Sequence, residues 1–155
     1  MLLRKPFIGL LFLTLLVGTA YASTDTYVDY MNIYAKKNFD YFKKDLRADF
    51  GLSNSRFEMI LKKVDSPGDL AVALWLGKKT SQSIDEVIKQ YRIHHGKGWG
   101  LIAQKLGVKP GSQTFQVLKA GRLDWQPREF EKVVREEKIK KAKQRKEKRL
   151  KEKGR

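Results

Sequence analysis

The sequence predicts an all-α protein: a compact bundle of short helices with a long aromatic N-terminal helix and a projecting basic C-terminal helix. Three observations support this fold class. Apolar residues recur at spacings of three and four, and serine or glycine residues stand where helices would begin and end. No stretch shows the sustained alternation of apolar and polar residues that is typical of a half-buried strand. The chain has no cysteine, so packing alone must hold the fold together.

The N-terminal leader has the three parts of a secretory signal peptide. Arg4 and Lys5 provide the positive start, residues 7–17 form an uncharged apolar run, and small residues precede Ser23. A membrane anchor would need about 20 apolar residues, and this run is shorter. We therefore expect cleavage between Ala22 and Ser23, a mature protein without a transmembrane segment, and a periplasmic or secreted location.

Composition divides the chain into four segments. These are a signal peptide (1–22), an aromatic amphipathic helix (23–52), a helical core domain (53–121) and a basic C-terminal helix or tail (122–155). The whole chain has 33 Lys and Arg against 17 Asp and Glu, a net charge of +16. The leader holds two of these cations and no acidic residue, so the mature charge is +14. Such a charge favours anionic partners but does not indicate the fold.

The N-terminal helix is rich in tyrosine. Gly51 marks its end, and one face carries Tyr27, Tyr30, Met31 and Tyr34. Two interpretations are open, because tyrosine is enriched both in packed contacts and at interfaces. The face either docks onto the rest of the domain or binds a partner protein, in which case the protein would be an adaptor of the cell envelope.

The core domain contains the clearest helix signals. Ser66 is placed to cap a helix whose first residue is Pro67, and residues 70–76 are apolar on all sides, which predicts a buried central helix ended by Gly77. Further signals are a capping box at the start of the next helix, a serine that caps the last core helix, and a boundary glycine: Ser83, Glu86, Ser112 and Gly121.

A glycine-rich joint at residues 96–100 connects two of the predicted core helices. Its glycines, Gly96 and Gly98, do not have the spacing of a nucleotide-binding loop, and they follow a helix instead of a strand. Trp99 either fills the core at this flexible joint or forms, with Lys97, a small site for a sugar or an anion. Lys97 and Trp99 are therefore the candidate ligand-binding residues.

The C-terminal segment predicts a helix that opens near Pro127 and docks through Phe130, Val133 and Val134. Beyond these residues the apolar pattern fails, and residues 128–155 hold 14 Lys and Arg against 6 Glu. This end is either a solvated helix or a disordered tail. Its candidate contacts with an anionic surface are Lys138, Lys140, Lys141, Lys143, Arg145, Lys146, Lys148 and Arg149.

No catalytic, cofactor-binding or metal-binding pattern stands out. His94 and His95 are adjacent and would point about 100° apart on a helix, so they do not form a metal pair. The sequence lacks the common serine-hydrolase, metalloprotease and nucleotide-binding motifs. We therefore expect no enzymatic activity and no cofactor.

Residues 66–119 contain the motif GxGWGxIAxxLGxxPGS at residues 96–112, together with characteristic segments at 66–69 and 87–92. With these features the chain resembles an uncharacterised family of small exported bacterial helical proteins. The resemblance implies no particular activity. Members tend to have a histidine directly after the phenylalanine, whereas here Gln116 follows Phe115, which argues against a metal or proton-transfer role at that position.

The leading functional hypothesis is a non-enzymatic periplasmic or secreted binding protein whose basic tail contacts an anionic lipid or polymer of the cell envelope. The alternatives are the envelope adaptor and small-molecule binding at the joint. Residues 99–107 also resemble the start of a helix-turn-helix, but we do not expect DNA as a partner because the leader would remove the protein from the chromosome.

Overall fold

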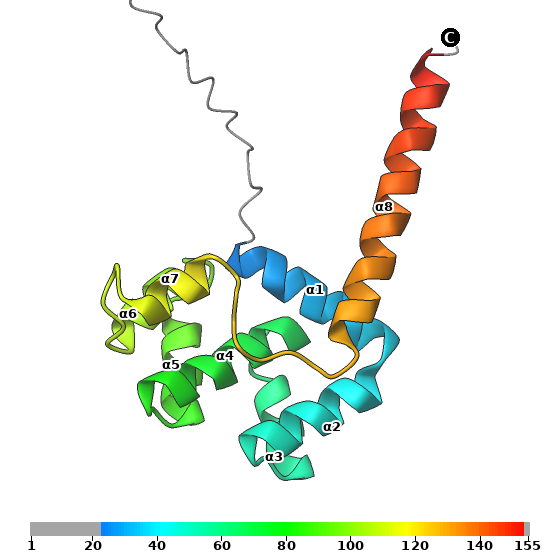
Figure 1. The fold of residues 1–155 in the computed structure, drawn as a ribbon. Helices are drawn as coiled ribbons and strands as arrows, with labels where there is room; N and C mark the ends of the chain where they lie inside the picture. Colours follow the sequence, from blue (N-terminus) through cyan, green and yellow to red (C-terminus); the bar gives the residue numbers. More distant parts are fainter. Residues whose placement is uncertain (1–22, 154–155) are drawn as a thin grey trace, which may run out of the picture.

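A computed structural model of the chain describes residues 23–153 (Figure 1). The predicted signal peptide, including Ala22, lies outside the described residues. The described part consists of eight α-helices without a β-strand, packed around one hydrophobic core. The predicted all-α fold class is confirmed. Within residues 23–153, no helix combines the length and the apolar character that crossing a membrane requires.

The helices follow one another with short connections, and α4 lies at the centre with α1, α3 and α5 packed against it. In chain order they are α1 (Thr24–Lys37), α2 (Phe39–Phe50), α3 (Asn54–Leu61), α4 (Pro67–Thr80), α5 (Ile84–Ile93), α6 (Trp99–Lys105), α7 (Gln113–Lys119) and α8 (Phe130–Lys153).

The predicted long N-terminal helix is divided in two. α1 ends at Lys37, and Asn38 leaves the helical region with φ −141° and ψ 49°. A straight helix of this length would extend about 40 Å, well beyond a domain of this size. The break lets α2 turn back, so that Phe42 and Leu46 are fully buried in the same core as α1. Gly51 caps the end of α2 in a left-handed conformation, as predicted.

α4 is the buried central helix that its apolar sequence predicts. Residues 70–76 are each at most 5% exposed. The Ser66 hydroxyl accepts a hydrogen bond from the Asp69 backbone N–H, and Pro67 occupies the first turn. Both signals therefore act as the sequence indicates.

Gly77 does not end α4, in contrast to the prediction. The helix continues to Thr80, and Ser81 closes it in a left-handed conformation with φ 55°. A Cβ atom at Gly77 would lie 3.2 Å from the carbonyl oxygen of Gln82. The glycine therefore serves close packing of the returning chain instead of helix termination.

α1 crosses α4 at a close approach of the two backbones. A Cβ atom at Gly68 would lie 2.5 Å from the carbonyl oxygen of Val28 and 2.9 Å from its Cα atom. The Gly68 backbone N–H also donates a hydrogen bond to Asn32 Oδ1 at 2.7 Å. Only glycine fits here, and the contact fixes the start of α4 against α1.

The tyrosine face of α1 is a packing surface. Tyr27 and Tyr34 are only 3% and 1% exposed. The Tyr27 hydroxyl donates to the carbonyl oxygen of Trp125 at 2.9 Å, and the Tyr34 ring packs against Phe130 with 6.3 Å between centroids. Tyr30 is partly buried. Tyr27 and Tyr34 therefore dock onto the rest of the domain. The hypothesis that this face binds a partner protein stays a prediction.

The first described residues are held by the domain. Ser23 caps α1 by accepting a hydrogen bond from the Thr26 backbone N–H. The Thr24 hydroxyl donates to the carbonyl oxygen of Leu118 at 2.6 Å. A Cβ atom at Gly121 would lie 2.2 Å from the Ser23 carbonyl oxygen, so the chain after α7 runs directly against the start of α1.

Two further predicted caps are present. The hydroxyls of Ser83 and Ser112 accept hydrogen bonds from backbone N–H groups in the first turns of α5 and α7. The capping box at α5 is half formed, because the Glu86 carboxylate accepts from the Gln90 side chain at 2.8 Å and does not turn back toward Ser83.

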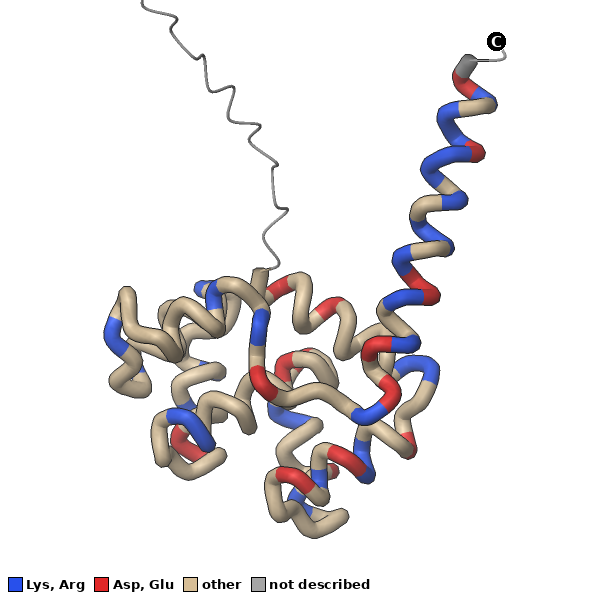
Figure 2. The backbone as a smooth tube through the Cα atoms, viewed as in Figure 1, with Lys and Arg blue, Asp and Glu red and all other residues tan. Residues whose placement is uncertain are grey.

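α8 docks at its start and then leaves the domain. It begins at Phe130, three residues after the predicted start at Pro127. Phe130 and Val133 are each 7% exposed and join the core, as predicted. Every side chain from 138 to 152 is exposed, and the helix projects from the body (Figure 1) with Lys and Arg along its length (Figure 2).

We predict opposite effects for alanine at two glycines that occupy the second residue of a helix. Gly68→Ala should destabilise the protein by about 1–3 kcal/mol, because its Cβ meets the backbone of α1. Gly100→Ala in α6 meets its nearest atom at 3.5 Å, an ordinary contact, and should be neutral or stabilising by up to about 1 kcal/mol. Urea unfolding measures both, and equal effects would contradict the close approach of α1 and α4.

Candidate functional site

A polar cluster surrounds Trp99, and its first part comes from the turn between α3 and α4. Asp65 and Asp69 flank the helix cap at Ser66. The Ser66 hydroxyl donates to Asp69 Oδ2 at 2.5 Å while it accepts from the Asp69 backbone N–H at 3.1 Å. The cap therefore fixes one carboxylate oxygen of Asp69 and leaves Oδ1 for another donor.

The second part of the cluster comes from the end of α5 and the joint that follows. Gly96 and Gly98 both have positive φ, 76° and 81°, a backbone conformation that suits glycine. This double turn brings Trp99 back beside α5. The Tyr91 and Trp99 rings then lie against each other, with 5.1 Å between centroids and 30° between planes.

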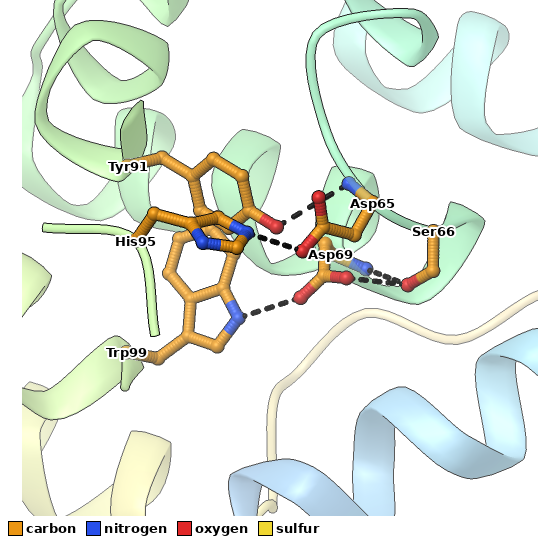
Figure 3. A network of polar contacts seen from close by, with 6 residues as sticks. All are labelled: Asp65, Ser66, Asp69, Tyr91, His95 and Trp99. Carbon is orange, nitrogen blue, oxygen red and sulfur yellow. Dashed lines mark hydrogen bonds and ion pairs between the residues drawn. The ribbon is translucent and has the colours of Figure 1, made fainter. Parts of the chain in front are cut away.

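Hydrogen bonds join the two parts (Figure 3). The Trp99 indole N–H donates to Asp69 Oδ1 at 3.0 Å. His95 Nε2 lies 2.6 Å from Asp65 Oδ2, and the Asp65 backbone N–H donates to the Tyr91 hydroxyl at 3.3 Å. The network ties the end of α5 and the start of α6 to the turn before α4.

The network changes two pKa values. The hydrogen bond from His95, followed by that from Tyr91, holds the pKa of Asp65 below its ordinary value of 3.8. Burial raises the pKa of the Tyr91 hydroxyl well above its ordinary value, with the carboxylates of Asp69 and Asp65 acting in the same direction. Tyr91 is therefore a neutral donor and acceptor at any physiological pH.

A shallow cavity of about 260 Å³ opens beside this network. Its lining residues are Asp25, Asp65, Asp69, Tyr91, His95, Gly96, Gly98, Trp99 and Ile102. The lining has three carboxylates and no Lys or Arg, so its charge opposes an anion. A small neutral or cationic molecule suits it better.

The structure separates the two predicted ligand-binding residues. Trp99 lines the cavity but is only 6% exposed, since its ring packs on Tyr91 and its N–H is bonded to Asp69. Lys97 is exposed on the joint and is absent from the lining. Trp99 therefore acts mainly as a packed residue of the joint. Within residues 23–153, no three His, Asp or Glu side chains are placed to hold a metal ion.

Sequence reasoning missed the partners of Trp99. Asp65 and Asp69 could be assigned to capping or surface pairing, and His95 to a partly exposed position, but not to one cluster. Asp69 and Trp99 lie 30 residues apart, and no local pattern connects them. The only signal near the joint in the sequence was a tyrosine and a histidine, Tyr91 and His95, and it did not point to the aspartates.

The second candidate site is the projecting part of α8. All eight cations predicted to contact an anionic surface lie there and are exposed. Lys138 and Lys141 lie over the Tyr30 ring, each 5.9 Å from its centroid. Among these eight, the structure pairs one with a carboxylate, Lys148 with Glu152 at 4.0 Å. A row of cations therefore faces solvent with little internal neutralisation.

The contact between His95 and Asp65 gives a prediction on pH. In a carboxyl NMR titration, Asp65 should titrate below 3.8 in the wild type and nearer 3.8 in His95→Ala. The pKa of Asp65 is lower in the folded state than in the unfolded state. The pair therefore stabilises the fold at a pH above the unfolded-state pKa, and this stabilisation is lost as the pH falls through the folded-state pKa. His94→Ala is the control and should leave the titration unchanged. If the pKa of Asp65 is the same in His95→Ala as in the wild type, the hydrogen-bond network is contradicted.

Comparison of the chain with protein-family models, curated proteins and solved structures found no match. The resemblance to an exported family therefore stays a prediction, and the geometry of the described residues is what bears on function.

Proposed function

We propose that this protein is a non-enzymatic periplasmic or secreted binding protein whose basic C-terminal helix contacts anionic material of the cell envelope. The observation that carries the proposal is the exposure of every side chain from 138 to 152 on a helix that projects from the domain. This segment is about 22 Å long at 1.5 Å per residue, which is long enough to contact several anionic groups at once.

The charge of α8 supports the same proposal. The helix has 12 Lys and Arg against 5 Glu, a net charge of +7. Near an anionic surface each cation contributes about 1 kcal/mol, and the attraction decays within about 8–10 Å at physiological salt. Docking of Phe130 and Val133 onto the core holds the start of the helix, so the charged part extends into solvent where a large partner can reach it.

The two alternative functions have weaker support. Small-molecule binding at the glycine-tryptophan joint has a cavity, but Trp99 is 6% exposed and its polar neighbours are already bonded to one another. The adaptor hypothesis relies on tyrosines of α1, of which Tyr27 and Tyr34 are buried. An adaptor would need another surface.

We predict that binding to anionic material depends on the eight exposed cations of α8. With all eight changed to glutamine in residues 23–155, affinity for vesicles with phosphatidylglycerol and for polyphosphate should fall more than a hundredfold. Glutamine has nearly the helix propensity of lysine, so circular dichroism should be unchanged. Wild-type affinity for polyphosphate should decrease linearly with salt on logarithmic axes, because binding releases counterions.

The control is a variant with glutamine at three surface lysines of the domain body, Lys62, Lys63 and Lys89, which should keep most of its affinity. Equal binding by the wild type and by the variant with eight glutamine substitutions would contradict the proposal.

A further inference from the structure

The charges of α8 are not distributed evenly around the helix. At 100° per residue, the four glutamates from Glu136 onward fall within one sector of about 160°. The remaining sector, about 200° wide, contains no acidic residue from Arg135 to the end of the described helix. We call this sector the cationic face. Its described cations are Arg135, Lys138, Lys143, Arg145, Lys146 and Arg149.

The opposite sector is electrically balanced. It holds four lysines, Lys140, Lys141, Lys148 and Lys151, and four glutamates, Glu136, Glu137, Glu147 and Glu152. It also faces the domain, since Phe130, Val133 and Glu137 lie on it, and Glu137 pairs with Lys37 of α1 at 3.3 Å. Apart from Lys138, which lies over the Tyr30 ring of α1, the net charge of the projecting helix therefore resides on the side turned away from its docking contacts.

The exposed apolar residues of the projecting helix also lie on the cationic face. Ile139 and Leu150 are 51% and 61% exposed. They are eleven residues apart, which places them three turns from each other and within about 20° around the axis. Ala142 lies between them on the same face. A thin apolar line thus runs between cations along about 16 Å of helix.

A flat anionic surface explains this arrangement better than a flexible polymer does. A polymer can wrap a projecting helix and contact cations on all sides, so it does not favour a sorted arrangement. A planar anionic surface contacts only one side of the helix, where cations are favoured and carboxylates are disfavoured. Exposed Ile and Leu on that side suit the boundary between lipid headgroups and acyl chains. Nucleic acid is less favoured, because no aromatic residue follows Phe130 to stack on bases.

We infer that α8 lies along an anionic phospholipid bilayer on its cationic face, with Ile139 and Leu150 entering the headgroup region. The inference rests on the proposed function and names its partner as the lipid surface. Contact is shallow because two large apolar side chains give little area to insert. Affinity comes mainly from the cations, at about fivefold per residue.

Two matched variants of residues 23–155 test the inference. The first changes Lys143, Arg145, Lys146 and Arg149 to glutamine and removes four charges from the cationic face. The second removes four charges from the opposite sector by changing Lys140, Lys141, Lys148 and Lys151 to glutamine. Binding is measured by cosedimentation with vesicles of phosphatidylglycerol and phosphatidylcholine, and in parallel with polyphosphate. Circular dichroism and melting temperature confirm that both variants fold.

The first variant should lose at least a hundredfold in affinity for vesicles, and the second less than tenfold. On polyphosphate the two variants should lose affinity equally. Equal losses on vesicles overturn the inference but leave the proposed function, because α8 then acts as an unsorted polycation. If both variants keep full affinity for vesicles and for polyphosphate, the inference and the proposed function are both overturned.

A third variant, Ile139→Gln with Leu150→Gln, keeps every charge. Its affinity for vesicles should fall about tenfold, with binding to polyphosphate unchanged, because only a bilayer offers an apolar region to these side chains. Unchanged affinity for vesicles would overturn the entry of the two residues into the headgroup region.

Discussion

The packing of α1 across α4 holds the other parts of the protein in place. The body of α4, residues 70–76, is apolar on all sides and must be covered completely, in a chain without disulfides. α1 covers it at the distance that Gly68 permits, where only a hydrogen atom separates the glycine from the backbone at Val28. Tyr34 of α1 then packs against Phe130 and so helps to determine where α8 begins. A shift of this one crossing would move the projecting helix as well.

Indole–carboxylate hydrogen bonds supplement this apolar packing. Each of the three tryptophans donates its N–H to an aspartate far away in the sequence: Trp75 to Asp124, Trp99 to Asp69 and Trp125 to Asp49. A buried indole N–H without a partner would be costly, so each aspartate satisfies a group that packing has removed from water. Lys79 also bonds Asp124 and, together with Trp75, holds the pKa of that carboxyl below its ordinary value.

Local sequence rules predicted the parts of the fold that depend on local physics. The caps at Ser66, Ser83 and Ser112 and the buried body of α4 follow from residue type and spacing alone, and they are confirmed. The break at Asn38 and the continuation past Gly77 were missed, because both depend on where distant chain packs.

The same limit applies to the candidate sites. The cations of α8 are contiguous and could be named from the sequence. The cluster of Asp65, Asp69, Tyr91 and His95 around Trp99 comes from two segments about 30 residues apart, so only the folded chain brings it together. Lys97 illustrates the opposite error: it is next to Gly98 and Trp99 in sequence, yet the left-handed turn carries it out of the cavity.

The contact between Ser23 and Gly121 has a consequence for processing if the predicted leader is cleaved after Ala22. Ser23, the first described residue, is held by its own helix and by a chain segment nearly a hundred residues later. A peptidase needs flexible, accessible chain on both sides of the bond that it cuts. Once α1 has docked, Ser23 is held by its cap and by Gly121, so a peptidase that needs flexible chain at this residue would have to displace it by local unfolding. For a leader that ends at residue 22, processing therefore competes with folding, and early removal during translocation is the easier route.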